Sequence, residues 1–355
     1  MKISRTAALG IVGLGLLLLI AGPLIPGGER LIRNDPPRSG HVTDLARADD
    51  GSILAGTQDG ELWRLDAGAW SRVRVDLGGH PVTALTADLA GDPATGPIGT
   101  GGGLFNRPAG LPPLDERVAD EWMTAKGLVV ATGEGLYIQG DGSWQRALTD
   151  TYVYRLEHQR HGDSDVLHAG TINAGVLTAS VADLLDWQPN RTGLPDDSNV
   201  FSFVLTEDNR LIAGSDQGLY WQPAPMQSWQ PLKIGLESSR MLALYLTPPN
   251  DDGRQRLWIG SDDGLWRVDL NETAEGVEAT AYAELAEAPP DHVQYGVSWI
   301  VPFDEGVMFS AGAVYYHGPM GLKGWIWISL AGVIFILLGG WLLPGREHQQ
   351  ADKSA

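Results

Sequence analysis

The residues with the clearest potential for chemistry recur at equivalent places along the chain. A polar residue enters each of several short apolar runs, and three of the runs carry a further polar residue inside them. Histidine, arginine, tyrosine and amide side chains can form a binding site when a rigid scaffold gathers them. We therefore take nine residues as candidate binding residues: His41, Asp44, His80, Tyr152, Arg155, Asn199, Ser202, Arg240 and Gln294.

Other polar motifs are better explained by turns than by catalysis or metal binding. Asp-Asp-Gly occurs at 49–51, 251–253 and 262–264 without the spaced oxygen ligands of a calcium loop, and Asp before Gly is typical of a turn. The Gly-rich segment 99–104 lacks the Lys-Ser/Thr of a phosphate-binding loop. No Ser-His-Asp arrangement can be assembled from the order of the residues. We expect no cofactor, no metal site and no enzymatic activity.

The elements that must position the candidate residues are repeated about seven times. The clearest copy is Arg256–Asp269, in which a strand, the turn Ser261–Gly264 and a return strand follow one another. Asp-Gly supplies the positive φ that tight hairpin turns need. The spacings between successive turn glycines are 43, 32, 40, 43, 46 and 48 residues, mostly near the roughly 40–50 residues of a propeller blade. These glycines are Gly60, Gly103, Gly135, Gly175, Gly218, Gly264 and Gly312.

Two further strand signals accompany the hairpin in most repeats. An apolar run lies upstream, and a tryptophan such as Trp70, Trp144, Trp187 or Trp229 closes several repeats downstream. Four short strands per repeat predict an all-β, seven-bladed β-propeller over residues 41–319. A β-solenoid has a shorter repeat, and Gly-dense, β-branched units exclude a helical repeat. The upstream runs are Val42–Ala46, Val82–Thr86, Tyr152–Leu156, Val200–Leu205, Met241–Leu246 and Val297–Val301.

The repeats resemble those of known propellers. Leu211–Tyr220 and Leu257–Trp266 look like the repeats of two-component-regulator sensor propellers. The Ala-Gly-Thr/Ser…Gly-Leu-Tyr pattern with its closing tryptophan is similar to photosystem-assembly-factor and bacterial-neuraminidase-type repeats. This resemblance covers roughly residues 41–318 and implies the fold, while the same fold hosts unrelated activities. The neuraminidase Asp-box is spaced differently from Ser261–Trp266, so no catalytic residue is carried over.

Charge and composition narrow the classes of partner. The formal net charge is −19, which argues against nucleic acid because a basic face would have to outweigh that field. The chain has no cysteine, which excludes disulfides, cysteine ligands and cysteine nucleophiles.

Both ends of the chain carry long apolar stretches. Ala7–Ile25 and Gly324–Leu343 predict an N-terminal signal-anchor or transmembrane helix within 1–26 and a C-terminal transmembrane helix within 320–344. A cleaved signal peptide is the alternative for the first stretch. Trp325, Trp327 and Trp341 suit the two interfaces of a bilayer. Two spans would place the propeller outside the cytoplasmic membrane, with both termini and the polar tail 345–355 in the cytoplasm.

Two outer strands of the propeller are harder to place. The last repeat has no room for a fourth strand, so Glu29–Asn34, within the linker 27–40, is a candidate strand that would close the ring. A plain linker is the alternative. After the sixth repeat, the acidic stretch Asn271–Asp291 is predicted to contain an extended strand around Val277–Tyr282, with a turn of helix as the alternative.

These features suggest three functions. The first is a non-enzymatic, membrane-anchored extracytoplasmic propeller that acts as a protein-binding or scaffold module for a membrane or envelope protein. Its two helices would contact the lipid bilayer. The second is a sensor propeller that binds a small-molecule ligand and signals through a separate partner. The third is a neuraminidase-like envelope hydrolase or lyase, for which the inner strands offer only Asp44 and Arg155.

Overall fold

A computed structural model describes residues 4–21, 29–37, 39–85, 96–124, 126–140, 143–319 and 324–342. The chain divides into two compact units. One consists of residues 32–316, and the other combines residues 1–31 with 317–355. The predicted polar tail, 345–355, lies outside the described residues.

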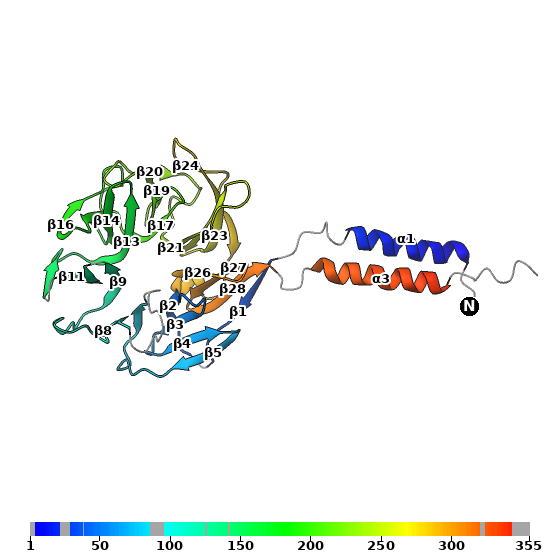
Figure 1. The fold of residues 1–355 in the computed structure, drawn as a ribbon, viewed down its shortest axis with the longest axis horizontal. Coiled ribbons are helices and arrows are strands. Elements are labelled where there is room, and N and C mark those ends of the chain that lie inside the picture. Colours follow the sequence, from blue (N-terminus) through cyan, green and yellow to red (C-terminus); the bar gives the residue numbers. More distant parts are fainter. Residues whose placement is uncertain are drawn as a thin grey trace, which may run out of the picture. The chain divides into compact units, whose positions relative to one another are not determined.

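The unit of residues 32–316 contains seven antiparallel sheets arranged in a ring (Figure 1). The first blade is β2 (Val42–Arg47), β3 (Ile53–Thr57), β4 (Leu62–Asp66) and β5 (Ala69–Val73). The second is β6 (Val82–Ala84), β7 (Ile98–Thr100) and β8 (Gly103–Phe105). The third is β9 (Val118–Thr124), β10 (Gly127–Thr132), β11 (Gly135–Gln139) and β12 (Trp144–Ala147). The fourth is β13 (Val153–His161), β14 (Ser164–Thr171), β15 (Val176–Ser180) and β16 (Asp183–Pro189).

The remaining blades complete the ring. The fifth is β17 (Val200–Leu205), β18 (Leu211–Ser215), β19 (Gly218–Gln222) and β20 (Gln230–Leu232). The sixth is β21 (Met241–Leu246), β22 (Gln255–Ser261) and β23 (Gly264–Glu272), with β24 (Val277–Ala279) and β25 (Glu284–Glu287) both paired to β23. The seventh contains β26 (Trp299–Phe303), β27 (Gly306–Ala311) and β28 (Ala313–Pro319), preceded by the short helix α2 (His292–Tyr295). The predicted seven-bladed propeller is therefore confirmed.

The turn glycines behave as the repeat pattern requires. All seven have positive φ, from +69° at Gly175 to +138° at Gly264. In the sixth blade Ser261 pairs with Gly264 and Leu257 with Val268, which is the hairpin read from the sequence. Only glycine adopts these conformations at low cost. The same turn therefore recurs around the ring.

A second glycine in most repeats allows neighbouring blades to approach closely. A Cβ added to Gly56 would lie 2.3 Å from Val82 Cγ1, and one added to Gly260 would lie 2.2 Å from the Val297 carbonyl oxygen. Both glycines lie one residue before the end of the second strand of a blade, and their neighbours lie at or just before the start of the inner strand of the next blade. The Ala-Gly-Thr/Ser motif thus marks the seam between blades, where large apolar side chains also form the core.

The seventh blade takes its outer strand from the other end of the chain. The sheet order is β1-β28-β27-β26, with β1 at Glu29–Arg33. Directly after β1, the Asn34 amide donates to the Val314 carbonyl at 2.8 Å, and Asp35 Oδ1 accepts from the Val314 amide at 2.7 Å. The segment proposed from the sequence as a closing strand therefore lies in the ring as its last strand.

The other unit contains two antiparallel helices, α1 (Arg5–Ala21) and α3 (Gly324–Leu342). They pack closely because a Cβ on Gly15 would lie 2.6 Å from the Gly332 carbonyl oxygen, and one on Gly339 would lie 2.6 Å from Val12 Cγ2. Glycine at these contacts brings the two backbones together.

The prediction of two transmembrane helices is wrong. No helix among the described residues is long and apolar enough to cross a bilayer. The helices have 17 and 19 residues, fewer than the about 20 of a typical spanning helix. The predicted location placed the propeller outside a membrane and both termini in the cytoplasm. That prediction depended on the two crossings and is therefore wrong as well.

Candidate functional site in the central channel

A ring of side chains surrounds the propeller axis at one level of the inner strands. In six blades the register shifts after the first inner-strand residue, as between Val42 and Asp44 or between Val153 and Arg155. Such bulges re-aim the residue that follows. The seven residues at this level pair with equivalent positions of the second strand: Asp44, Ala84, Asp120, Arg155, Ser202, Ala243 and Trp299.

Arg155 is held across the channel between two of these residues. Its guanidinium carbon lies 4.1 Å from the centre of the Trp299 ring, and its Nη1 lies 3.8 Å from Asp120 Oδ2. The other partners are backbone groups: the Leu156 amide donates to Asp120 Oδ2 at 2.7 Å, and Trp299 Nε1 donates to the Thr43 carbonyl at 2.8 Å. Arg155 and Trp299 line cavities on both sides, so they divide the channel.

The cavity on the side of the hairpin turns, the turn-side chamber, has a volume of about 390 Å³. Its polar lining comes from residues that enter inner strands and from turns, including Arg117, Gln58 and Ser298. Tyr295 Oη and His41 Nε2 lie 2.7 Å apart at its edge. Among the described residues that line this chamber, two are arginines and none is acidic.

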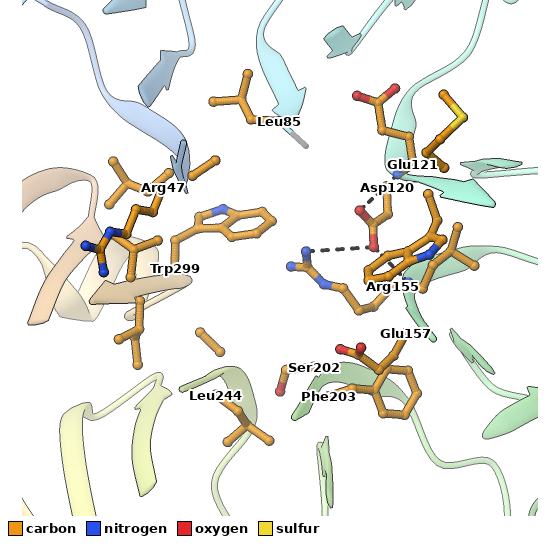
Figure 2. Close-up of a pocket in the computed structure, with 18 residues that line it drawn as sticks. Arg47, Leu85, Asp120, Glu121, Arg155, Glu157, Ser202, Phe203, Leu244 and Trp299 are labelled. Atoms are coloured by element: carbon orange, nitrogen blue, oxygen red, sulfur yellow. Dashed lines mark hydrogen bonds and ion pairs between the residues drawn. The ribbon is translucent and has the colours of Figure 1, made fainter. Parts of the chain in front are cut away.

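The cavity on the opposite side, the far-side chamber, has a volume of about 460 Å³ and is lined by all seven blades. Figure 2 shows Asp120, Arg155 and Glu157 directed toward its centre, while the guanidinium of Arg47 points away from them. Its remaining walls are largely apolar: Leu45, Ala46, Leu85, Trp122, Met123, Leu156, Phe203, Ala243, Leu244, Ile300 and Val301. Within the described part of the chain, no group of three or more His, Asp and Glu side chains has a metal-binding arrangement.

Burial shifts the acidity of the carboxyl groups around Arg155. Burial raises the pKa of Asp44 to about 8, with Arg155 opposing the shift and Asp120 adding to it. Burial likewise raises the pKa of Glu157 to about 7, and the negative charge of Asp120 raises it further. The pKa of Asp120 is also raised by burial, against the opposing charge of Arg155. Arg155 is therefore a positively charged neighbour of all three carboxyl groups.

We predict that these carboxyls make the propeller less stable as the pH rises. Asp44 ionises near its usual pKa in the unfolded chain but only near pH 8 in the folded one, so unfolding releases a proton between about pH 4 and 8 and stability falls across that window. In Asp44→Asn, the fall in the free energy of unfolding between about pH 4 and 8 should be smaller than in the parent by more than about 2 kcal/mol. Urea unfolding at several pH values measures this difference. Glu278→Gln, an exposed site, removes one carboxyl as a control, and equal pH profiles for the two variants would refute the prediction.

The structure brings together only part of the predicted candidate set. His41 and Arg155 line the turn-side chamber, Arg155 and Ser202 line the far-side chamber, and Asp44 is fully buried at their level. Ser202 also links blades, because its hydroxyl donates to the Met241 carbonyl at 3.0 Å. The other five residues line neither chamber: His80, Tyr152, Asn199, Arg240 and Gln294.

Two of those five have structural partners in the turn of their own blade. The Asn199 side chain donates to Asp216 Oδ2 at 2.5 Å, and Arg240 Nε donates to Asp262 Oδ2 at 2.8 Å. Such contacts brace the connection between blades against the hairpin turn. These residues therefore have an evident structural role on the same face.

Sequence reasoning missed four residues that line one or both chambers. Asp120 and Arg117 belong to the third blade, whose inner strand β9 has three charged or aromatic residues in Asp120–Trp122 and so lacks an apolar run. Glu157 and Trp299 lie within the inner strands β13 and β26, but they were not among the predicted candidates. The repeat pattern places an inner strand shortly before β10, and that spacing could have located Asp120 and Arg117.

Comparison with known proteins finds similarity only at the level of structure. No protein-family model and no curated protein matches the chain. The extracellular domain of the one component system BT4673 from B. thetaiotaomicron superimposes with a TM-score of 0.60 at 14% identity, covering 81% of this chain and 39% of that one. YCF48 bound to D1 peptide gives a TM-score of 0.55 at 14% identity, covering 83% and 98% of the two chains. An ancestral GH74 enzyme gives 0.58 at 16% identity, covering 84% and 46%.

The similarity is one of fold. The resemblance to sensor propellers and to a photosystem assembly factor, which the repeats suggested, is confirmed at that level. The chain spans about two fifths of the length of the BT4673 chain.

Proposed function

We propose that this chain is a non-catalytic binding propeller that holds a segment of a partner protein on the face carrying the hairpin turns. The observation that carries the proposal is the turn-side chamber, where side chains from separate blades converge around an open cavity of about 390 Å³. Binding sites are commonly built from loops on a rigid scaffold in this way. YCF48, which shares the fold, is known bound to a peptide, and we propose the same kind of use here.

The chemistry of the chamber favours an acidic group on the bound segment. The guanidinium of Arg117 is exposed and has no ion pair with any described residue, and Arg155 forms the floor. Tyr154 and Tyr295 add amphipathic contact area at the wall, as tyrosine does at many interfaces. A side-chain or terminal carboxylate entering from the turn face would meet these groups first.

Site-specific photo-crosslinking tests this proposal. A benzoylphenylalanine in place of Gln58, an exposed lining residue, should capture a partner in cell extract, whereas one in place of Tyr282, which is 79% exposed on the sixth blade, should not. Arg117→Glu should weaken that capture about tenfold. Arg74→Glu, an exposed arginine after β5, makes the same charge change as a control. Equal capture from both positions, or no effect of Arg117→Glu, would refute the proposal.

A further inference from the structure

The far-side chamber has the size and lining of a small-molecule site. Its volume of about 460 Å³ falls within the roughly 300–1,000 Å³ of ligand pockets, which combine apolar walls with a few convergent polar groups. Here the walls are aliphatic and aromatic, and the convergent groups are the carboxylates of Asp120 and Glu157 (Figure 2). The proposed partner face uses the opposite side of the Arg155–Trp299 contact.

The positive charges that line this chamber already have partners or point away from its centre. Arg155 is stacked on Trp299 and paired with Asp120, and the Arg47 guanidinium points away from the centre (Figure 2). Glu157 forms no ion pair with a described residue. An acidic, half-buried cavity with apolar walls therefore has room for one more cation.

A buried carboxyl group beside the chamber also favours a bound cation. Asp44 is fully buried at the ring level shared with Asp120 and Arg155, and its carboxyl group forms no side-chain hydrogen bond or ion pair within the described residues. Buried polar groups usually have partners, and a buried carboxylate is costly without a compensating positive charge. A cation in the chamber would supply that charge.

We propose that the far-side chamber binds a small organic amine, whose ammonium group pairs with Glu157 and Asp120 while its apolar body packs on the walls. The net charge of −19 favours the approach of cations to the channel. The pKa of Glu157 is raised to about 7 by burial and by the negative charge of Asp120, which together outweigh the opposing charge of Arg155. This inference does not depend on the proposed partner face.

Calorimetric titration of the full-length chain at about pH 8 tests the proposal, with phenethylamine as the probe and 2-phenylethanol as its uncharged counterpart. The amine should bind at least about tenfold more tightly than the alcohol, because only the amine pairs with the carboxylates. Glu157→Gln, which keeps the shape of the side chain, should weaken amine binding about tenfold and leave the alcohol unchanged. Glu207→Gln, an exposed glutamate, removes the same charge and should change neither.

Three results would overturn the proposal. The first is equal affinity for amine and alcohol, or no amine binding. The second is amine binding that neither Glu157→Gln nor Asp120→Asn weakens in variants with the parent melting temperature. The third is binding of N-acetyl-lysine amide or of calcium in place of phenethylamine, which would assign the chamber to a lysine of a partner protein or to a metal ion.

Discussion

Replacing Gly260 by alanine is expected to lower the free energy of unfolding by about 3 kcal/mol or more. The added Cβ would lie 2.2 Å from the Val297 carbonyl oxygen and 2.8 Å from Val297 Cγ1. Because the backbone of the next blade supplies the closest atom, a rotamer change cannot relieve the contact. The seam between the sixth and seventh blades would have to open, and urea unfolding measures the cost.

Gly133→Ala is the matched control for this substitution. No atom lies within 4 Å of a Cβ built on Gly133, and its φ is not positive. Its stability should stay within about 0.5 kcal/mol of the parent. Equal urea midpoints for the two variants would show that the seam glycines are not required for close blade packing.

Removing β1 is expected to have the second large effect. A chain that begins at residue 36 loses the outer strand of the seventh blade and the contacts of Asn34 and Asp35 with Val314. A chain that begins at residue 29 keeps them, and both lack α1. The shorter chain should be less stable by about 3 kcal/mol or more, since several ladder hydrogen bonds of about 1 kcal/mol each are lost.

Hydrogen exchange locates the effect of this truncation. Amides of β28 should lose protection in the chain that starts at residue 36, while those of β18 in the fifth blade should lose it only with global unfolding. Indistinguishable stability and protection in the two chains would contradict a closing role for β1.

The repeats were predictable because local rules determine them. A glycine with positive φ, as at Gly264, marks each hairpin, and most of the inner strands are short continuous apolar runs. β9 was missed because its sequence, Val118–Thr124, mixes charged and apolar residues. Its place in the sheet comes from pairing with β10, which is a tertiary constraint.

The two terminal helices show what composition alone does not predict. The apolar stretches at both ends form helices, but no described helix is long and apolar enough to cross a bilayer, and helix bounds cannot be read from composition alone. The close contacts of Gly15 with Gly332 and of Gly339 with Val12 depend on how two distant segments meet. Nothing local in the sequence specifies that pairing.

The candidate site was the least predictable part. Arg155 was selected from its position in an inner strand. Its stacking on Trp299 and its pairing with Asp120 connect three blades, and both partners lie 35 or more residues away in the sequence. The division of the channel into one chamber without acidic side chains and another lined by carboxylates follows from those long-range contacts. No motif in the sequence encodes it.

The structure of this chain bound to a partner captured from cell extract would test the proposed function most directly. We expect a partner segment on the hairpin-turn face, with an acidic group beside Arg117 and the turn-side chamber filled. A partner seated on the outer strands of the blades, with the chamber left open, would contradict it.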